Sequence, residues 1–399
     1  MALTRALTIG VDATTWSNRR GFGRFTRGQL GAMLAEPRGH RFVLFLDREP
    51  ADEMLRPNVE VVQVKTSATV TDAAVADGNR RPRDVLPFSR AVSSRKLDIF
   101  WFPAVYSWFP VRPGIPTIVT FHDAIAEHFT NLVLPRLRGR LLWNLKVWLA
   151  RRSARHIATV SEAARTEIIR YLHIPRDKIS VILEAADARF RPVLDDGARR
   201  SARKSLGLPA DKRLILYVGG LAPHKNLAGL IHGFATAVAS GKLGDVDLVL
   251  AGDAKGDGFH SDADALHALV KARDLEARVH FPGFVPDDIL PALYSDAMVV
   301  AMPAFSEGFG LPAAEAIACG TPVIATAGGA VAEVVGAAGL FFDPHQANDI
   351  ARVIEQIAGD ASSLARLRQQ CLPRSAELSW ATSGARMLDL LEAHARRTR

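Results

Sequence analysis

Cysteine is scarce in this sequence, since only Cys319 and Cys371 occur among its 399 residues. Two cysteines exclude a disulfide framework and any metal site built from several cysteines, and they favour a reducing compartment. Long hydrophobic runs are also missing, because no stretch reaches the roughly 18 uninterrupted apolar residues that a membrane-spanning helix needs. We therefore expect a cytoplasmic protein without a membrane-spanning helix.

The composition is that of a folded globular chain. Hydrophobic residues make up 48% and charged residues 23% of the sequence, and these proportions exclude disorder, a coiled coil and collagen-like repeats. Because domains usually contain roughly 100 to 200 residues, the length favours two domains, with one large domain left open.

Acidic residues are absent from the segment 131–161. Its seven basic residues, which nearly account for the formal net charge of +8, are Arg136, Arg138, Arg140, Lys146, Arg151, Arg152 and Arg155. Apolar residues from Leu134 to Trp148 recur every three or four positions, which predicts a helix with one apolar stripe. Such a helix either docks on an anionic membrane or buries its stripe in the protein core, and the sequence leaves both interpretations open.

Short apolar segments rich in β-branched residues alternate with helical patterns along the chain. Strands are predicted at 6–13, 41–46, 59–64, 98–103, 117–122 and 156–161 in the first half, and at 213–220, 247–252, 278–284, 297–303 and 322–326 in the second. Continuously apolar strands separated by helices are typical of parallel sheets covered on both faces, so we expect an α/β fold with two Rossmann-like domains. A stretch rich in proline, glycine and charge at 188–211 separates the halves, and we set the domains at 1–190 and 191–375.

The strongest candidate for a ligand site is the segment PAFSEGFGLPAAEAIACG at 303–320. A predicted strand leads into a glycine loop that ends at Gly310, and Pro312 then opens a predicted helix. Backbone amides at such a helix start can hold a phosphate group. Glu307 and Glu315 can reach two parts of one ligand, whereas the competing interpretation is an ordinary turn followed by a solvated helix residue.

Three further positions follow predicted strands. Lys225 lies after the strand 213–220 and just before a predicted helix, where its charge can neutralise a pyrophosphate. Gly23 lies in the segment GFG after the first strand, and His122 ends the strand 117–122, at the sheet edge where α/β proteins bind ligands. Taken alone, each position is also compatible with a structural role.

These motifs together resemble glycosyltransferase family 4, a group of retaining enzymes that use nucleotide sugars and have the GT-B fold. The similarity extends over nearly the whole chain, through the segments GFGRFTRGQL, TFHDAI, ATVSEAARTEI, YVGGLAPHKNLAGLI, EGFGLPAAEAIACGTPVIA and LSWATSGARML. The spacing of Glu307 and Glu315 reproduces the E-x7-E motif of the family. The resemblance implies two Rossmann-like domains with parallel sheets that face a central cleft, and a C-terminal helix at 376–399 that crosses back to the first domain.

The resemblance implies a role for each candidate residue. Lys225 would hold the donor phosphates and Glu315 the ribose hydroxyls. Glu307 would contact the transferred sugar and His122 would lie beside it, so that we predict His122, Lys225 and Glu307 as the catalytic residues. The further donor contacts that it implies are Gly23, Phe284, Val285, Phe309, Gly310 and Leu311. Because His224 stands where relatives often have arginine, neutralisation of the phosphates is expected to depend mainly on Lys225.

We expect an enzyme that transfers a hexose-type sugar, with retention, from a UDP- or GDP-linked donor to a glycan, glycolipid or lipid-linked acceptor in polysaccharide or cell-envelope biosynthesis. The alternatives are a nucleotide-sugar epimerase of the same fold and a catalytically silent protein that binds sugar nucleotides. The resemblance implies no metal and no cofactor in the site, and no nucleic-acid module accompanies the basic residues. An anionic membrane surface that contacts residues 136–155 is the further partner considered, which would place the protein at the inner face of the membrane.

Overall fold

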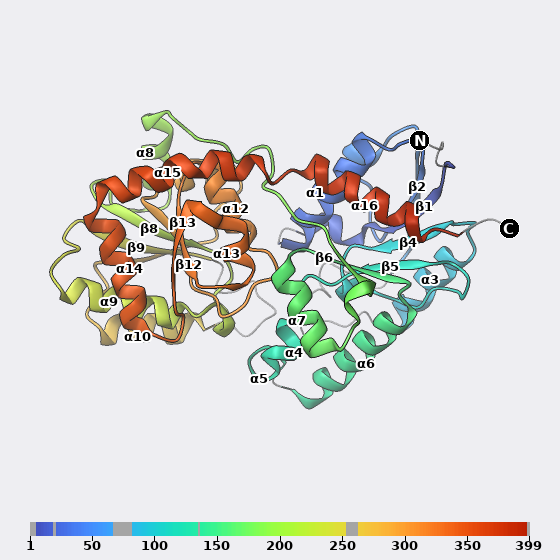
Figure 1. Ribbon diagram of the computed structural model, residues 1–399, viewed down its shortest axis with the longest axis horizontal. Coiled ribbons are helices and arrows are strands. Elements are labelled where there is room, and N and C mark those ends of the chain that lie inside the picture. The colour runs from blue at the N-terminus through green and yellow to red at the C-terminus, as the bar shows by residue number, and fades with distance from the viewer. Residues whose placement is uncertain (1–4, 19–20, 67–81, 135, 253–261, 397–399) are drawn as a thin grey trace. The chain divides into compact units, whose positions relative to one another are not determined.

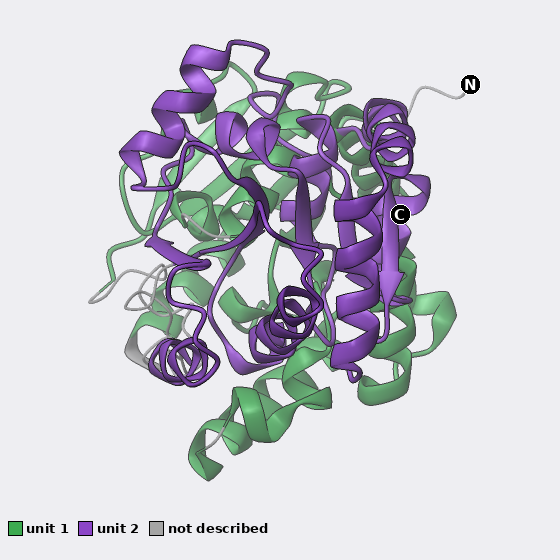
Figure 2. Ribbon diagram, turned by 90° about the vertical axis from the view of Figure 1, so that its left-hand side faces the viewer, with its two compact units in different colours: residues 1–184, 380–399 green, residues 185–379 purple. Residues whose placement is uncertain are grey.

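The computed structural model of the chain describes residues 5–18, 21–66, 82–134, 136–252 and 262–396. The chain forms two compact units. Unit 1 contains residues 1–184 and 380–399, and unit 2 contains residues 185–379; Figure 2 draws them in green and purple. The chain therefore enters unit 2 after Glu184 and returns to unit 1 at Trp380.

Unit 1 is built on a parallel sheet of seven strands, sheet A, with the order β3-β2-β1-β4-β5-β6-β7. The strands are β1 (Thr8–Asp12), β2 (Arg41–Leu46), β3 (Val59–Gln63), β4 (Ile99–Phe102), β5 (Thr117–Thr120), β6 (His156–Thr159) and β7 (Ile179–Val181). Successive connections run outwards on both sides of the neighbours β1 and β4, so the topological switch point of this doubly wound sheet lies between these two strands.

Helices connect and cover the strands of sheet A (Figure 1). They are α1 (Gly21–Ala35), α3 (Pro82–Ser93), α4 (Ile125–His128), α5 (Thr130–Val133), α6 (Leu137–Ser153), α7 (Glu162–Leu172) and α16 (Trp380–His394). Short 3₁₀ helices are η1 (Ala13–Ser17), η2 (Asp52–Met54), η3 (Val105–Ser107) and η4 (Arg176–Lys178). Among the helices of the described ranges, none is long and apolar enough to cross a membrane.

The last helix, α16, packs on α1 within unit 1, which confirms the predicted return of the chain to the first domain. The Trp380 indole occupies the space that a Cβ atom of Gly28 would take, so the contact requires glycine on α1. One turn further, the Ser383 hydroxyl donates a hydrogen bond of 2.6 Å to the Gln29 side chain in a buried position. A close approach of the two helices thus joins the end of the chain to its first helix.

Unit 2 is built on a parallel sheet of six strands, sheet B, with the order β10-β9-β8-β11-β12-β13. The strands are β8 (Arg213–Val218), β9 (Val246–Ala251), β10 (Val279–Gly283), β11 (Val299–Met302), β12 (Val323–Thr326) and β13 (Gly339–Phe342). The helices are α8 (Asp196–Ser205), α9 (Leu227–Ala239), α10 (Ala263–Ala272), α11 (Leu290–Asp296), α12 (Leu311–Ala318), α13 (Gly329–Val335), α14 (Ala347–Gly359) and α15 (Ala361–Ala376), with 3₁₀ helices η5 (Pro223–Lys225) and η6 (Gly336–Ala338). The switch point of sheet B lies between β8 and β11.

Buried apolar side chains cover both faces of sheet B. One cluster joins the sheet to α9 and α14 and contains Phe234 and Ile350, and the other joins it to α11 and α12 and contains Leu293 and Ile317. Helices on both faces explain why the strands are apolar along their whole length rather than at alternate positions.

The structure confirms two Rossmann-like α/β domains and contains a strand in each of the eleven predicted segments. It adds two strands that the sequence did not predict, β7 and β13, which have three and four residues and form edges of their sheets. The predicted linker at 188–211 also contains a helix, α8, whose start is capped by the Asp195 side chain. Its surface is so polar that the segment was mistaken for a linker.

Candidate functional site

The loops that follow β8 and β11 meet at the switch point of sheet B. Lys225 ends η5 directly before α9, and Glu307 lies in the loop between β11 and α12. The Nζ atom of Lys225 lies 2.7 Å and 2.9 Å from the two carboxylate oxygens of Glu307. The fold thus joins two residues that the sequence predicted as site residues, 82 positions apart, in one partly buried ion pair.

His224, the neighbour of this pair, is buried. Burial, and then the charge of Lys225, lowers the pKa of His224 to about 3. His224 is therefore neutral at physiological pH and adds no positive charge to the site. In the loop after β8, the positive charge therefore comes from Lys225, and the expected neutralisation of donor phosphates by this residue stays a prediction.

The glycine loop continues into α12 as the sequence predicts. Gly310 precedes the helix with φ at +94°, and a Cβ atom there would lie 2.8 Å from the Val331 side chain, so both backbone and packing require glycine. The helix begins at Leu311, with Pro312 in its first turn. The side chains of Phe309 and Leu311 are buried, which leaves their backbone as the part that a ligand can contact.

Glu315 lies in α12 and is buried. The hydroxyl of Tyr294, a buried residue of α11, donates a hydrogen bond of 3.0 Å to its Oε2 atom. The solvated helix position that was the alternative for Glu315 is therefore wrong. The sequence did not predict Tyr294 as a site residue. Nothing in the apolar segment LPALYSD indicates that its hydroxyl contacts the Glu315 carboxylate, 21 residues further on.

Phe284 and Val285 follow β10, the edge strand of sheet B. The side chain of Val285 is buried, whereas Phe284 is 57% exposed. An exposed aromatic ring next to a buried anchor suits the expected contact with a nucleotide base. One strand, β9, separates this position from the β8 loop that carries Lys225.

Gly23 lies in the first turn of α1, after β1 at the switch point of sheet A. The carbonyl oxygen of Asn18 occupies the space of a Cβ atom at this position, so the local fold itself requires glycine. The packing of α1 against Asn18 is thus enough to explain why position 23 is a glycine. The expected contact of its amide with a pyrophosphate stays a prediction.

His122 follows β5 and is buried at the carboxyl edge of sheet A. Its Nε2 atom lies 2.9 Å from the carbonyl oxygen of Pro103, which follows β4. The rings of Phe22 and Phe25 meet the imidazole edge-on, at centroid distances of 5.0 Å and 4.5 Å. Since these phenylalanines flank Gly23 in α1, the fold brings the two predicted site residues of unit 1 into one neighbourhood.

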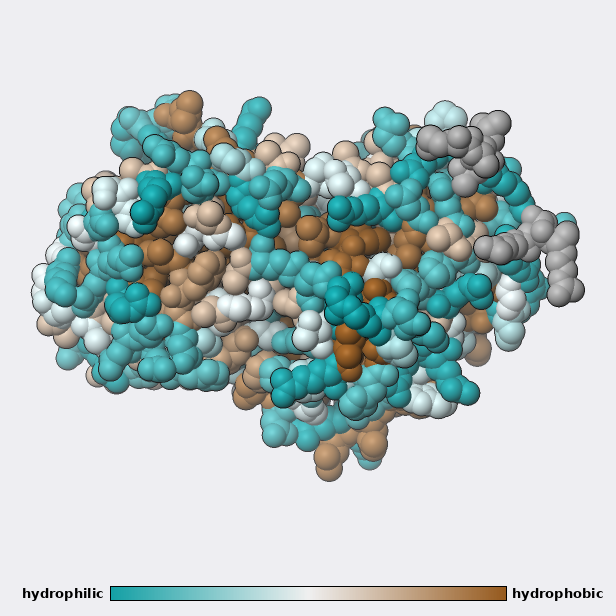
Figure 3. Space-filling model, viewed as in Figure 1, coloured by the Kyte–Doolittle hydropathy of each residue, from teal (hydrophilic) through white to brown (hydrophobic). Residues whose placement is uncertain are grey.

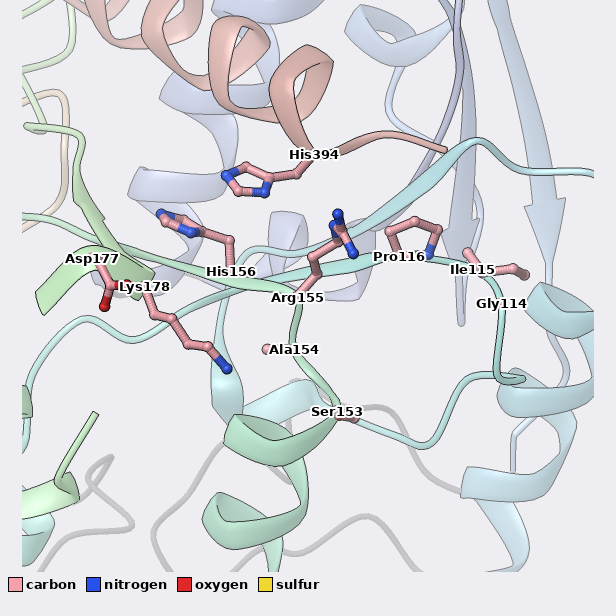
Figure 4. Close-up of a pocket in the computed structure, with 10 residues that line it drawn as sticks. All are labelled: Gly114, Ile115, Pro116, Ser153, Ala154, Arg155, His156, Asp177, Lys178 and His394. Atoms are coloured by element: carbon pink, nitrogen blue, oxygen red, sulfur yellow. The ribbon is translucent and has the colours of Figure 1, made fainter. Parts of the chain in front are cut away.

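A cavity of about 730 Å³ lies at the opposite, amino edge of sheet A (Figure 4). Its lining includes Arg155, His156, Asp177, Lys178 and His394, but none of the predicted site residues. The cavity lies at the edge of sheet A opposite to the edge that carries His122. We therefore do not assign it to the candidate site.

The basic helix α6 buries a different face from the one that the sequence suggested. Its buried residues are Trp143, Val147 and Ala150. The residues of the predicted stripe that lie within the helix are exposed, with Leu137 at 74% and Leu141 at 71%, so burial of this stripe in the core is wrong. In Figure 3, hydrophobic side chains stand out at the lower edge of unit 1, where Figure 1 places α6.

The two tryptophans of α6 differ in their surroundings. Trp148 is exposed, whereas Trp143 is buried and donates a hydrogen bond of 2.7 Å from Nε1 to the Glu127 carboxylate. Burial is the main cause that raises the pKa of Glu127 to about 7, against the effect of this hydrogen bond. Trp143 therefore anchors α6 to the domain, and only Trp148 is available at the surface.

Two doubly wound units with charged residues at the switch point of sheet B define the GT-B class of proteins. Residues 24–189 match the family model described as Glycosyltransferase Family 4, and residues 198–371 match the one described as Glycosyl transferases group 1. The chain belongs to glycosyltransferase family 4.

Relatives among curated proteins include D-inositol 3-phosphate glycosyltransferase of Rhodococcus opacus, with 31% identity over 289 residues, 70% of this chain and 63% of the relative. O-antigen chain mannosyltransferase B of Escherichia coli is 33% identical over 233 residues, 57% of this chain and 58% of the relative. The chain thus spans less than two thirds of the length of either relative.

Solved structures share the fold over nearly the full chain. Sucrose-phosphate synthase from Thermosynechococcus elongatus has a TM-score of 0.74 at 22% identity, over 98% of this chain and 99% of that chain. Anabaena HepE in complex with UDP and glucose has a TM-score of 0.70 at 21% identity, over 97% and 100% of the two chains.

Proposed function

We propose that the protein is a retaining glycosyltransferase that moves a hexose-type sugar from a UDP- or GDP-linked donor to a glycan, glycolipid or lipid-linked acceptor. The observation that carries this proposal is the ion pair of Lys225 and Glu307 at the switch point of sheet B. A cation and a carboxylate that face each other can each exchange their partner for a group of the donor. The ammonium then binds the diphosphate and the carboxylate accepts hydrogen bonds from sugar hydroxyls.

The remaining residues of unit 2 supply the other donor contacts. Glu315, held by Tyr294, binds the ribose hydroxyls, and the exposed ring of Phe284 borders the base beside Val285. The backbone of Phe309, Gly310 and Leu311 contacts the sugar or the phosphates. The complex of HepE with UDP and glucose supports a nucleotide sugar as the donor class.

The proposed reaction takes place on one face of the sugar. The acceptor hydroxyl oxygen forms a bond to the anomeric carbon while the bond from that carbon to the diphosphate oxygen breaks. The departing diphosphate takes the proton of the acceptor hydroxyl, and Lys225 neutralises the negative charge that develops on it. No metal ion takes part in the proposed site, because the Lys225 ammonium supplies the positive charge for the phosphates.

The acceptor side of the proposal rests on the exposed face of α6. We define the α6 surface as the exposed apolar residues Leu137, Leu141, Leu142, Leu145, Trp148 and Leu149. Arg138 and Arg152 of the same helix are exposed as well. Apolar side chains flanked by positive charges, on a segment without acidic residues, suit an anionic membrane that carries the acceptor.

The names of the relatives support a role in the cell envelope. O-antigen chain mannosyltransferase B is named for the transfer of mannose in an O-antigen chain. We accordingly place the proposed transfer in polysaccharide or cell-envelope biosynthesis, with the protein in the cytoplasm and at the inner face of the membrane.

The test is an incubation of the purified chain with UDP- and GDP-linked hexoses and a membrane lipid extract as the source of acceptor. The proposal predicts release of nucleotide diphosphate that depends on the extract, and NMR of the product is expected to show the anomeric configuration of the donor. Conversion of the donor into an epimeric sugar nucleotide would identify an epimerase instead. Binding of the donor without any turnover would identify a silent binding protein.

A further inference from the structure

A buried carboxyl group of unit 1 lies against His122. Glu184 follows β7 at the carboxyl edge of sheet A, where its side chain is buried. Its Oε1 atom lies 3.4 Å from the Nδ1 atom of His122. Among the described residues, His122 is the side chain that interacts with the Glu184 carboxyl group.

The opposite nitrogen of the ring determines which proton this contact controls. The Nε2 atom of His122 lies 2.9 Å from the carbonyl oxygen of Pro103. A carbonyl oxygen only accepts hydrogen bonds, so Nε2 carries a hydrogen and donates it. Protonation of the ring is therefore variable only at Nδ1, which is the atom that faces Glu184.

The pair of Glu184 and His122 holds one proton between them. A carboxylate opposite an unprotonated Nδ1 would bring two lone pairs together, which is unfavourable in a buried place. The pair is either an imidazolium with a carboxylate or a neutral imidazole with a protonated carboxyl group, and it is neutral as a whole in both forms. Burial raises the pKa of Glu184, and His122 acts against this rise.

Aromatic side chains fix the ring from other directions. Phe22 and Phe25 of α1 meet the imidazole at interplanar angles of 73° and 87°. With Pro103 at one nitrogen and Glu184 at the other, both polar atoms of the ring are already engaged. The ring is thus held in a single orientation beside the turn that contains Gly23.

We propose that Glu184 is the positioning residue of His122, which orients the imidazole and holds one proton between its carboxyl group and Nδ1. This inference rests on the proposed function and on the place beside the transferred sugar that the family resemblance implies for His122. It also defines what His122 does there: with both nitrogens engaged, the ring does not take the proton of the acceptor hydroxyl. That proton goes to the departing diphosphate.

The first test follows the ring directly by ¹⁵N NMR of the full chain labelled at histidine, with the His122 signals assigned by the variant His122→Asn. Glu184→Gln keeps the size of the side chain and removes its charge. At one fixed pH, the Nδ1 signal of His122 is expected to differ between the wild-type protein and Glu184→Gln, because the proton shared with the carboxyl group is lost. Identical His122 signals in the two proteins would overturn the proposal.

A matched control is available in the same unit. Glu167 lies 3.8 Å from the Nδ1 atom of His128, and the side chains of this second pair are much more exposed. Glu167→Gln is expected to leave the His122 signals unchanged. A change of the Nδ1 signal of His122 in this control as large as in Glu184→Gln would mean that distant charges cause the effect, and it would overturn the specific role of Glu184.

The second test is kinetic. Glu184→Gln is expected to lower kcat at least tenfold with less than a twofold change in the donor KM, and to shift the pH–rate profile. An unchanged kcat and profile would overturn the positioning role. If the wild-type protein shows no transfer at all, the proposed function fails, while the NMR comparison at fixed pH still decides whether Glu184 engages Nδ1 of His122.

Discussion

The ammonium group of Lys225 and the carboxylate of Glu307 lie 2.7 Å apart at the switch point of sheet B. Both side chains are partly buried, so the charges attract each other more strongly than an exposed pair does. A diphosphate that binds to Lys225 must therefore compete with Glu307. We therefore expect Lys225 to favour nucleotide binding and Glu307 to oppose it.

Glu307→Gln is expected to raise the affinity for free UDP or GDP, because it removes the negative charge that competes for Lys225. The expected gain is at least roughly two- to fivefold, which is the value of an exposed ion pair, because this pair is partly buried. Transfer is expected to fall strongly, since the carboxylate that contacts the sugar is lost. Calorimetry and a turnover assay on the same preparation measure both effects.

The control is Glu355→Gln, which breaks the exposed pair of Glu355 with Lys242, also in unit 2. This variant is expected to leave affinity and turnover at wild-type values. Weaker nucleotide binding by Glu307→Gln than by the wild-type protein would show that Glu307 binds the nucleotide itself rather than competing with it.

Tyr294→Phe removes the hydroxyl group that donates to Glu315. A hydrogen bond to a charged group contributes about 1.5–3 kcal/mol, so the unfolding free energy is expected to fall by about this amount. Nucleotide affinity is expected to fall as well, because Glu315 loses its orientation. A double-mutant cycle with Glu315→Gln measures the coupling between the two side chains, and additive losses of nucleotide affinity would show that Tyr294 stabilises the fold without orienting Glu315.

Much of the fold could be predicted from the sequence, because central strands buried on both faces are apolar along their whole length. The sequence did not predict the edge strand β7, because its three residues are too few to form the long apolar run by which the central strands are recognised. The helix α8 was missed because its exposed face is charged, so its pattern resembles that of a linker.

The site could be predicted only where short motifs carry it. Lys225, Glu307 and Gly310 lie in strand, loop and helix units that the sequence displays. Tyr294 and Glu184 could not be found in this way, because each acts through a contact with a residue distant in the chain. Which face of α6 is buried likewise depends on the side chains against which the domain packs, and periodicity does not contain that information.

The α6 surface is expected to bind vesicles that contain anionic lipids at low salt. Each basic residue near such a surface contributes about 1 kcal/mol, and a leucine that becomes fully buried about 1.5–3 kcal/mol. The double variant Leu137→Ser and Leu141→Ser is expected to abolish flotation with the vesicles. Leu194→Ser, at a position 84% exposed in unit 2, is the matched control and is expected to float like the wild-type protein.

Flotation is measured with anionic and neutral vesicles at low and at high salt. If the basic residues dominate, vesicle binding is expected to fall strongly at high salt. Binding that persists at high salt would show that the exposed leucines dominate. Absence of the protein from anionic vesicles at low salt would contradict a membrane partner for α6 and would favour a soluble acceptor.

The stacked rings of His156 and His394 predict a loss of stability in acid. Their centroids are 4.3 Å apart, and burial, followed by His394 and opposed by Asp177, lowers the pKa of His156 to about 4. An unfolded histidine binds a proton near its ordinary pKa of about 6.5, whereas the folded protein resists protonation. The contribution of neutral His156 to the free energy of unfolding is therefore complete above about pH 6.5, and it is lost as the pH falls from about 6.5 towards 4.

Thermal unfolding at pH 7 and pH 5 measures this effect. The wild-type protein is expected to lose more stability between these values than His156→Gln, which lacks the titrating group. Arg155 and Lys178 border the same cavity, and Lys178 also lowers the pKa of His156, so Lys178→Gln is expected to reduce the acid loss partly. An equal loss in the wild-type protein and in His156→Gln would exclude this histidine as the cause.

The most direct test of the proposed function is the effect of Lys225→Ala on nucleotide binding and sugar transfer, compared with Lys242→Ala, which removes a lysine from an exposed ion pair of unit 2. Loss of the cation at the diphosphate is expected to lower the transfer rate by roughly 10²–10³ and to weaken UDP or GDP binding, while the fold stays intact by circular dichroism. Lys242→Ala is expected to match the wild-type protein in both measurements. A Lys225→Ala variant with wild-type affinity and rate would contradict a nucleotide-sugar site at the switch point of sheet B.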